Sequence, residues 1–246
     1  CCSVFHCNES LGEKNSVKKA EQELKNRYES LENKYDKFLA ENYDYKANTY
    51  ETNKINLLSN PTSLYTKQPT VYYGLMYFAK KEVKIHTPYI ICNGYMYKEL
   101  KNIKVPTTIM TNSAENNGNI FGAVDYLNHK KDIINTGVTI KEYEGGISYH
   151  GKSMTIDDDI AIVGSFNMDM RSAYIDTELM LVINSKDINK QLKASMEEYE
   201  KKAATVKNET EYSHIPEGMK MKELSDKKKN IKAWFGWAMN GLRFLF

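Results

Sequence analysis

Residues 149–169, YHGKSMTIDDDIAIVGSFNMD, combine a histidine, a lysine and an aspartate at a spacing that suits phosphate chemistry. Lys152 and Asp157 follow His150 at offsets of 2 and 7 residues. An imidazole can attack phosphorus or carry a proton, and an ammonium group can hold a phosphate oxygen. A pair of apolar strands with ordinary polar residues is the alternative, but it leaves this combination unexplained. We therefore expect these three to form the catalytic group of a phosphodiester site, with Asp157 supporting the structure or balancing charge rather than attacking.

A hairpin of two short strands would bring further polar side chains to the same place. Three consecutive aspartates at 157–159 predict the tight turn, and IAIVGSFN is the returning strand. Side chains alternate along a strand, so His150 and Lys152 are expected on one face of the first strand. Ser165 and Asn167 are likewise expected on one face at the end of the second strand, where a hydroxyl and an amide would bind phosphate oxygens.

Glu178 lies in the next predicted strand, 28 residues after His150. Its carboxylate would accept the second N–H of the imidazole, which fixes the tautomer and stabilises the charged form. The four cysteines form no CxxC pair and have no histidine at zinc-finger spacing, so we predict no metal site and expect no cofactor. For His6, His129 and His214, which lie in no comparable setting, we expect surface or structural roles.

Strands that alternate with helices from residue 71 onward predict an α/β domain with a mixed, largely buried β-sheet flanked by helices. The predicted helices cover 71–81, 94–103, 118–135 and 186–205, and the predicted strands cover 82–91, 105–112, 137–144 and 177–185 in addition to the hairpin. We assign this domain to residues 71–205.

The segments before and after this domain differ from it in composition. Apolar residues at helical spacing within 11–46 predict one long amphipathic helix or two shorter ones, and residues 47–70 predict a connecting loop because they hold two prolines and many Asn, Thr and Ser. Residues 1–70 are thus interpreted as a helical linker segment with a loop. The tail, residues 206–246, ends in KKKNIKAWFGWAMNGLRFLF, which suits either a helix in the membrane interface or a helix docked on the domain.

Composition limits the class of partner. With 41% apolar and 27% charged residues the 246-residue chain is globular, and no apolar run approaches the ~20 residues of a membrane span. A net charge of +2 does not favour a nucleic-acid partner. The Cys1 start leaves two interpretations open, a fragment of a longer chain or a processed lipoprotein with a lipidated Cys1.

Two segments carry a resemblance to a known family. HGKSMTID, followed by GSFNMDMRS, resembles the His-Lys-Asp motif of the phospholipase D superfamily with its trailing Gly-Ser-x-Asn. HTPYII, residues 86–91, resembles the Ser/Thr-Pro-Tyr segment upstream of the second such motif in bacterial cardiolipin synthases, and the Asn-x-Asp-x-Arg-Ser run is similar to their form of the motif. The resemblance covers roughly residues 71–190 and points to the C-terminal half of such a synthase.

The resemblance implies a phosphatidyltransferase that acts through a phosphohistidine intermediate without a metal ion. In this family two motifs form one site, in which one histidine attacks phosphorus and the other protonates the departing alcohol. The residues that match by position are His150, Lys152, Asp157, Ser165, Asn167 and Glu178. The resemblance also implies phospholipid substrates, phosphatidylglycerol among them, and a peripheral position on the cytoplasmic side of the bacterial cell membrane.

The chain departs from this pattern because it contains a single complete motif. A missing N-terminal half would leave the isolated chain inactive, whereas a second copy would complete one site in a homodimer. Two other functions stay open: a phosphodiesterase or nuclease of the same superfamily, and a membrane-binding module or lipoprotein with a residual motif. The nearly neutral charge and the full set of site residues favour the phosphatidyltransferase.

Overall fold

The computed structural model contains two compact units, residues 1–49 and residues 50–246. It describes residues 15–35, 49–60, 71–235 and 243. In the first unit, α2 (Asn15–Tyr35) is a helix of 21 residues whose side chains are exposed at residues 15–30, and Glu21 and Lys25, four residues apart, form an ion pair of 2.9 Å. The helix predicted within residues 11–46 is confirmed over this span, and the rest of that range lies outside the described residues.

The second unit is built on one large mixed sheet, which confirms the predicted α/β class. Among the described residues the sheet has nine strands. In order across the sheet they are β1 (Lys54–Asn60), β9 (Glu178–Asn184), β7 (Ile160–Gly164), β6 (Ser153–Ile156), β2 (Val83–His86), β4 (Thr107–Asn112), β5 (Thr139–Tyr143), β10 (Ala203–Val206) and β11 (Tyr212–His214). A separate two-stranded sheet pairs β3 (Ile90–Ile91) with β8 (Met168–Asp169).

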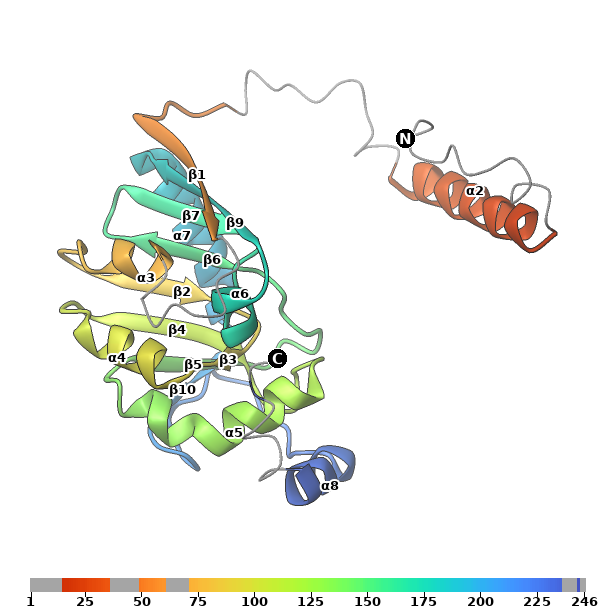
Figure 1. Cartoon of the computed structure of the whole chain (residues 1–246). Helices are drawn as coiled ribbons and strands as arrows, with labels where there is room; N and C mark the ends of the chain where they lie inside the picture. The colour runs from red at the N-terminus through yellow and green to blue at the C-terminus, as the bar shows by residue number, and fades with distance from the viewer. Residues whose placement is uncertain (1–14, 36–48, 61–70, 236–242, 244–246) are drawn as a thin grey trace. The chain divides into compact units, whose positions relative to one another are not determined.

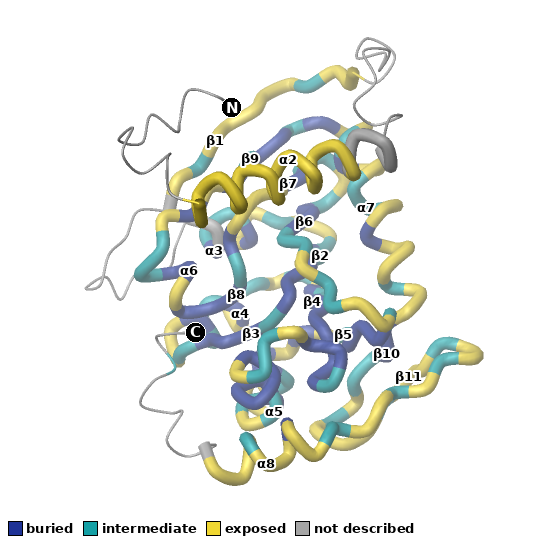
Figure 2. The backbone as a smooth tube through the Cα atoms, turned by 90° about the vertical axis from the view of Figure 1, so that its right-hand side faces the viewer, coloured by how far each residue is buried: buried dark blue, intermediate teal, exposed yellow. Residues whose placement is uncertain are grey.

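Helices cover both faces of the large sheet (Figure 1). On one face lie α3 (Val71–Met76), α4 (Gly94–Asn102) and α5 (Ile120–Ile134), and on the other lies α7 (Lys186–Glu200). The core between the sheet and the first helix layer includes the fully buried Tyr73, Met96 and Tyr126, packed with apolar strand residues such as Ile85 and Ile109. The central strands β6, β2 and β4 are largely buried, while β11 and α8 are largely exposed (Figure 2).

Strands β2, β4 and β5 run parallel to one another, and every other pairing in the large sheet is antiparallel. The parallel strands are joined by the crossover helices α4 and α5 because a parallel pair cannot be closed by a tight turn. Asn93 and Asn119 cap these helices, accepting hydrogen bonds of 3.0 and 3.1 Å from the N–H groups of Met96 and Gly122.

Two segments differ from the sequence-based expectation. The loop predicted over residues 47–70 contains β1, which pairs with β9 at the edge of the sheet. Its apolar residues Ile55 and Leu57 are 51% and 65% exposed, so the strand forms through long-range pairing rather than through a buried apolar pattern. The helix predicted over 186–205 ends at Glu200, and residues 203–206 instead form β10 against β5.

The tail is anchored on the second unit by two basic side chains. In α8 (Asp226–Phe235) the buried Lys228 ammonium donates to the backbone carbonyls of Ala114, Glu115 and Asn117 at 2.8, 2.5 and 3.0 Å. Arg243 forms an ion pair of 2.6 Å with Asp125 of α5. These contacts favour the docked form of the tail at both points. None of the described helices is long and apolar enough to span a bilayer.

Candidate active site

The predicted site residues other than the motif aspartate gather at one end of the sheet. The parallel strands β2, β4 and β5 end there, and β6 runs the other way, so β6 begins there. Because β7 is antiparallel to both β6 and β9, the end of β7 and the start of β9 lie at this same end of the sheet. His150 and Lys152 precede β6, Ser165 and Asn167 follow β7, and Glu178 is the first residue of β9.

His150 and Lys152 lie before the strand rather than in it. The expectation that both side chains project from one face of a strand is corrected, because β6 begins at Ser153. The Lys152 carbonyl still accepts a hydrogen bond of 3.3 Å from the Gly164 N–H, which continues the hairpin pairing by one step. The Lys152 ammonium lies 2.9 Å from Nδ1 of His150 and donates to the His150 carbonyl at 2.9 Å.

The surroundings of this pair keep the imidazole neutral. His150 is exposed as a residue, but partial desolvation of its ring, followed by the positive charge of Lys152, holds the pKa of His150 below the ordinary value of a histidine. Burial also lowers the pKa of Lys152, although the negative charges of Glu178 and Asp169 oppose this shift. A neutral imidazole has a free lone pair, which is the form that a nucleophile or a general base requires.

Gly151 lies between these two residues, at a position where any side chain would clash with Tyr149. A Cβ atom at this position would lie 2.2 Å from the hydroxyl oxygen of Tyr149. The Tyr149 ring has little freedom to move away, since it packs edge-on against the rings of Tyr143 and Tyr199 with centroids 5.9 and 4.8 Å apart. The glycine therefore allows the tyrosine to lie over the backbone of the His-x-Lys segment.

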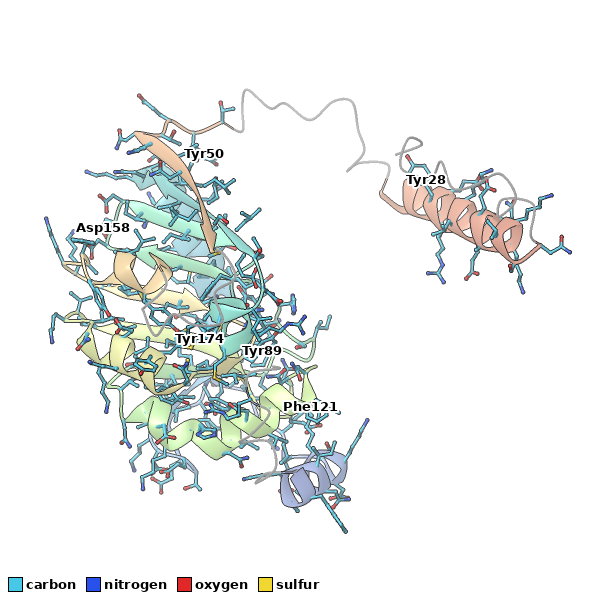
Figure 3. The ribbon with its side chains drawn as sticks, in the orientation of Figure 1. Tyr28, Tyr50, Tyr89, Phe121, Asp158 and Tyr174 are labelled. Carbon is cyan, nitrogen blue, oxygen red and sulfur yellow. The ribbon has the colours of Figure 1, made fainter. Side chains whose placement is uncertain are left out.

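Asp157 lies at the opposite end of β6 from Lys152, which at ~3.3 Å per residue places it roughly 16 Å away. Figure 3 shows the adjacent Asp158 at the end of the sheet opposite Tyr89, which lies three residues after the end of β2 and directly before β3. The Asp157 carboxylate accepts hydrogen bonds of 2.7 to 3.2 Å from the backbone N–H groups of Lys80, Lys81 and Glu82.

Asp157 therefore lies apart from His150 and Lys152, and its contacts are those of a residue that supports the structure. Burial opposes its ionisation, but the hydrogen bonds from the three N–H groups outweigh burial and lower the pKa of Asp157. Its φ of 52° is in the left-handed region, which the predicted turn at residues 157–159 requires. The aspartate thus binds the chain entering β2 to the turn of the hairpin.

Ser165, Asn167 and Glu178 form contacts among neighbouring elements rather than with the imidazole. The Ser165 hydroxyl accepts a hydrogen bond of 3.0 Å from the N–H of Leu179 in β9. Ser172 accepts from the Asn167 side-chain amide at 3.2 Å and donates to the Glu178 carboxylate at 2.6 Å. Among the described residues no hydrogen bond joins Glu178 to His150, so the predicted carboxylate–imidazole contact is absent from this structure.

Gly164, the last residue of β7, stands where a side chain would clash with β9. A Cβ atom at Gly164 would lie 2.1 Å from the backbone carbonyl oxygen of Leu179, which cannot move without shifting β9. The glycine lets β7 and β9 approach closely at the edge of the sheet where Ser165 and Glu178 lie.

A surface pocket of about 680 Å³ opens beside His150. The segment between β5 and β6, which includes His150 and Lys152, lines most of it, and Val163 of β7 and residues near the end of α7 complete the lining. Ser165, Asn167 and Glu178 do not line it. Within the described residues no group of three or more His, Cys, Asp or Glu side chains could hold a metal ion.

Comparison with known proteins places this geometry in a family. The model of the PLD-like domain of cardiolipin synthase matches residues 74–199, which is about half of the chain and includes the whole hairpin. The chain belongs to this family. The shared domain contains β2 through α7, so every residue of the candidate site lies within it.

Known members are similar over this region. Cardiolipin synthase 1 of Staphylococcus epidermidis strain ATCC 12228 is 30% identical over 155 residues, which cover 62% of this chain and 31% of the relative. Cardiolipin synthase A of Wigglesworthia glossinidia brevipalpis is 35% identical over 68 residues, covering 28% of this chain and 14% of the relative. The chain thus spans about a third or less of the length of these relatives.

A solved structure supports the fold. Phosphatidylserine synthase from Haemophilus influenzae Rd KW20 superposes with a TM-score of 0.58 at 15% identity, over 78% of this chain and 48% of that chain. At this level of identity the similarity concerns the arrangement of strands and helices alone.

The PLD-like domain contains two site residues that the sequence analysis did not select. Asp169 caps α6 (Met170–Tyr174) by accepting from the Ser172 N–H at 2.5 Å. Burial raises the pKa of Asp169 to about 6, although the hydrogen bonds from Ser172 oppose the shift. The second residue is Ser172. The Asn-x-Asp-x-Arg-Ser pattern could have indicated both, because it places Asp169, a residue type that caps helices, three positions before Ser172.

Proposed function

We propose that the chain supplies one half of a phosphatidyltransferase active site, with His150 and Lys152 as its catalytic residues. The observation that carries the proposal is the exposed His150 imidazole, whose Nδ1 lies 2.9 Å from the Lys152 ammonium at the edge where three parallel strands end. Membership of the PLD-like domain family supports the same assignment. Lys152 holds a phosphate oxygen while the neutral imidazole acts on phosphorus or on a proton.

The reaction consists of two displacements at phosphorus. In the first, a lone pair of one histidine forms an N–P bond while the bond from phosphorus to the first alcohol oxygen breaks. The departing oxygen takes a proton from a second histidine, which acts as general acid. In the second displacement that histidine removes the proton of the acceptor alcohol, whose oxygen attacks phosphorus as the N–P bond breaks. The phosphatidyl group is thereby exchanged between two alcohols.

The second histidine must come from another complete His-Lys-Asp motif, because the sequence contains one; His129 and Lys131 share the His-x-Lys spacing, but Thr136 stands where the aspartate would be. A second copy of this chain, or the other half of a longer polypeptide, would supply it. The exposure of His150 supports this requirement, since the residue is accessible to a facing group. Ser165, Asn167 and Glu178 support the site by fixing the end of β7, the start of α6 and the start of β9 against one another.

Phospholipids are the proposed substrates, with phosphatidylglycerol as the first donor to test and a membrane surface as the place of reaction. The near-neutral charge of +2 supports a lipid over a nucleic acid, whose backbone is bound through a strongly basic surface. In α8, Trp234 is 78% exposed next to several lysines, which suits contact with lipid headgroups.

The test is an assay of the full chain with phosphatidylglycerol vesicles and, separately, with single-stranded DNA. The chain is measured over a range of protein concentrations, because a site shared by two copies gives a rate that rises more steeply than in proportion to concentration. Lipid transfer that His150→Ala abolishes supports the proposal. DNA cleavage without lipid transfer contradicts it and favours a nuclease.

A further inference from the structure

The side-chain amide of Asn112 joins two segments of the site that are far apart in sequence. Asn112 is the last residue of β4 and is 1% exposed. Its Nδ2 donates to the carbonyls of Pro88 and Tyr149 at 2.8 and 2.9 Å. Its Oδ1 accepts from the Tyr149 N–H at 2.8 Å and from the Asn116 side chain at 3.1 Å. All four hydrogen-bonding positions of this buried amide are thus used.

The two hydrogen bonds from Asn112 to Tyr149 take the place of the backbone hydrogen bonds that an adjacent strand would make. Residues 144–152, between β5 and β6, belong to no ladder of the sheet, so their backbone groups need other partners. The Asn112 amide pairs with both the N–H and the carbonyl of Tyr149, as a residue in an adjacent strand would. Tyr149 directly precedes His150, so this pairing fixes the backbone on which the catalytic histidine is carried.

Neighbouring contacts hold the same segment from the same side. Asn116 donates to the Ile147 carbonyl at 3.2 Å, and Ser148 accepts from the Gly118 N–H at 3.0 Å. On the other side, the Tyr149 hydroxyl lies 3.3 Å from Nδ1 of the buried His86. The backbone and the ring of Tyr149 are therefore both fixed, and Asn112 makes the only pair of backbone bonds to this residue among the described contacts.

We propose that Asn112 is a positioning residue, which acts through the backbone of Tyr149 to hold His150 and Lys152 in place. It does not line the pocket beside His150, so it acts on the site without contact with a ligand. The effect on catalysis rests on the proposed function of His150 and Lys152, whereas the effect on their geometry does not.

The test compares three variants by NMR and by lipid transfer. Asn112→Ala removes both bonds to Tyr149, and Asn116→Ala removes one bond to Asn112 and one to Ile147. Thr111→Val is the matched control, because this neighbouring hydroxyl is buried and has no hydrogen-bond partner among the described residues. Unchanged exchange of the Ile162 amide in β7 shows that each variant folds.

For Asn112→Ala we expect hydrogen exchange at the Tyr149 amide to rise by about tenfold or more, since a buried bond is lost. The imidazole of His150 should titrate closer to an ordinary histidine, because a loosened segment is less buried and less close to Lys152. Asn116→Ala should shift both readouts less, and Thr111→Val should leave both as in the wild type. If Asn112→Ala does not fold, the Asn116→Ala shifts decide.

The outcomes separate the inference from the proposed function. Titration and exchange that stay unchanged in folded Asn112→Ala, or in Asn116→Ala if the first does not fold, overturn the inference. In an active protein we expect kcat to fall about tenfold or more with KM nearly constant, since misplaced catalytic groups slow the chemical step. Absence of lipid transfer by the wild type, with the NMR shifts present, contradicts the proposed function and leaves the inference standing.

Discussion

The Lys152 ammonium lies 2.9 Å from Nδ1 of His150, so the charge of the lysine disfavours protonation of the imidazole. Burial and this charge both hold the pKa of His150 below its ordinary value, and the neutral form therefore persists to a lower pH than in free histidine. Hydrogen bonds to the backbone hold the pair on both sides, from Gly164 of the hairpin to Lys152 and from Asn112 to Tyr149, the residue before His150.

Replacing Lys152 with methionine should raise the pKa of His150, because the charge is removed while most of the burial remains. An NMR titration of the His150 ring measures this shift directly. Lys186→Met, an exposed change at the start of α7, is the control and should leave the titration unchanged. A His150 pKa that falls or stays constant in Lys152→Met would contradict the account of the pair.

Gly151→Ala should lower lipid transfer by roughly 10- to 100-fold, since a small displacement of reacting groups has effects of this size. The new methyl group would meet the Tyr149 hydroxyl at 2.2 Å and push the ring or the His-x-Lys backbone out of place. Gly74→Ala in α3 is the control, because a Cβ there has nothing within 4 Å. Equal activity of the two variants would show that the tyrosine does not constrain the segment.

Asp157→Asn should destabilise the fold by about 1–3 kcal/mol and leave transfer per folded molecule nearly unchanged, because hydrogen bonds to an ionised acceptor are weakened. Urea unfolding measures the first effect and an assay of the folded protein the second. Asp158→Asn is the matched control, because the Asp158 carboxylate is exposed and its loss should destabilise the fold less than the loss of the Asp157 carboxylate. Loss of activity in fully folded Asp157→Asn would return this residue to the catalytic group.

Acid should weaken the fold through Glu200 at the end of α7. Burial favours its protonated form, but hydrogen bonds from His86 and Lys141 outweigh burial and lower the pKa of Glu200 to about 2. A carboxylate with a lowered folded-state pKa contributes stability that is present above its unfolded value and lost as pH falls through the folded value.

The urea concentration at the midpoint of unfolding should therefore decrease as the pH is lowered from ~4.5 to ~2. Glu200→Gln should remove this part of the pH dependence. Glu198→Gln is the control, since Glu198 is exposed and pairs with Lys201, the residue that follows the end of α7. A Glu200→Gln profile identical to the wild type would contradict the assigned role.

The fold could be predicted wherever a local pattern encoded it. Helices with apolar spacing, the Asp-rich hairpin turn at 157–159 and the alternation from residue 71 onward all correspond to elements of the structure. The strand β1 could not be predicted, because its partners lie more than 100 residues away in β9 and two of its apolar side chains, Ile55 and Leu57, remain exposed. Long-range pairing, rather than local propensity, makes it a strand.

The arrangement of the candidate site was predicted in part. The spacing of His150, Lys152 and Ser165 identified residues that the sheet does bring to one end, because the hairpin folds back on itself. The spacing placed Asp157 with them, yet a four-residue strand separates it from the other end. The bonds of Asn112 to Tyr149 cross from one strand end to another loop, and no pattern along the chain shows such a contact.

The central claim is that His150 belongs to one half of a phosphatidyl-transfer site. The most direct test measures transfer of a labelled phosphatidyl group to glycerol by the chain alone, and by the chain mixed with the part of the Staphylococcus epidermidis relative outside the matched segment. We expect transfer in one of these arms, reduced about 10³-fold or more by His150→Asn and unchanged by His129→Asn. Transfer that persists in His150→Asn, or its absence from the wild type in both arms, would contradict the claim.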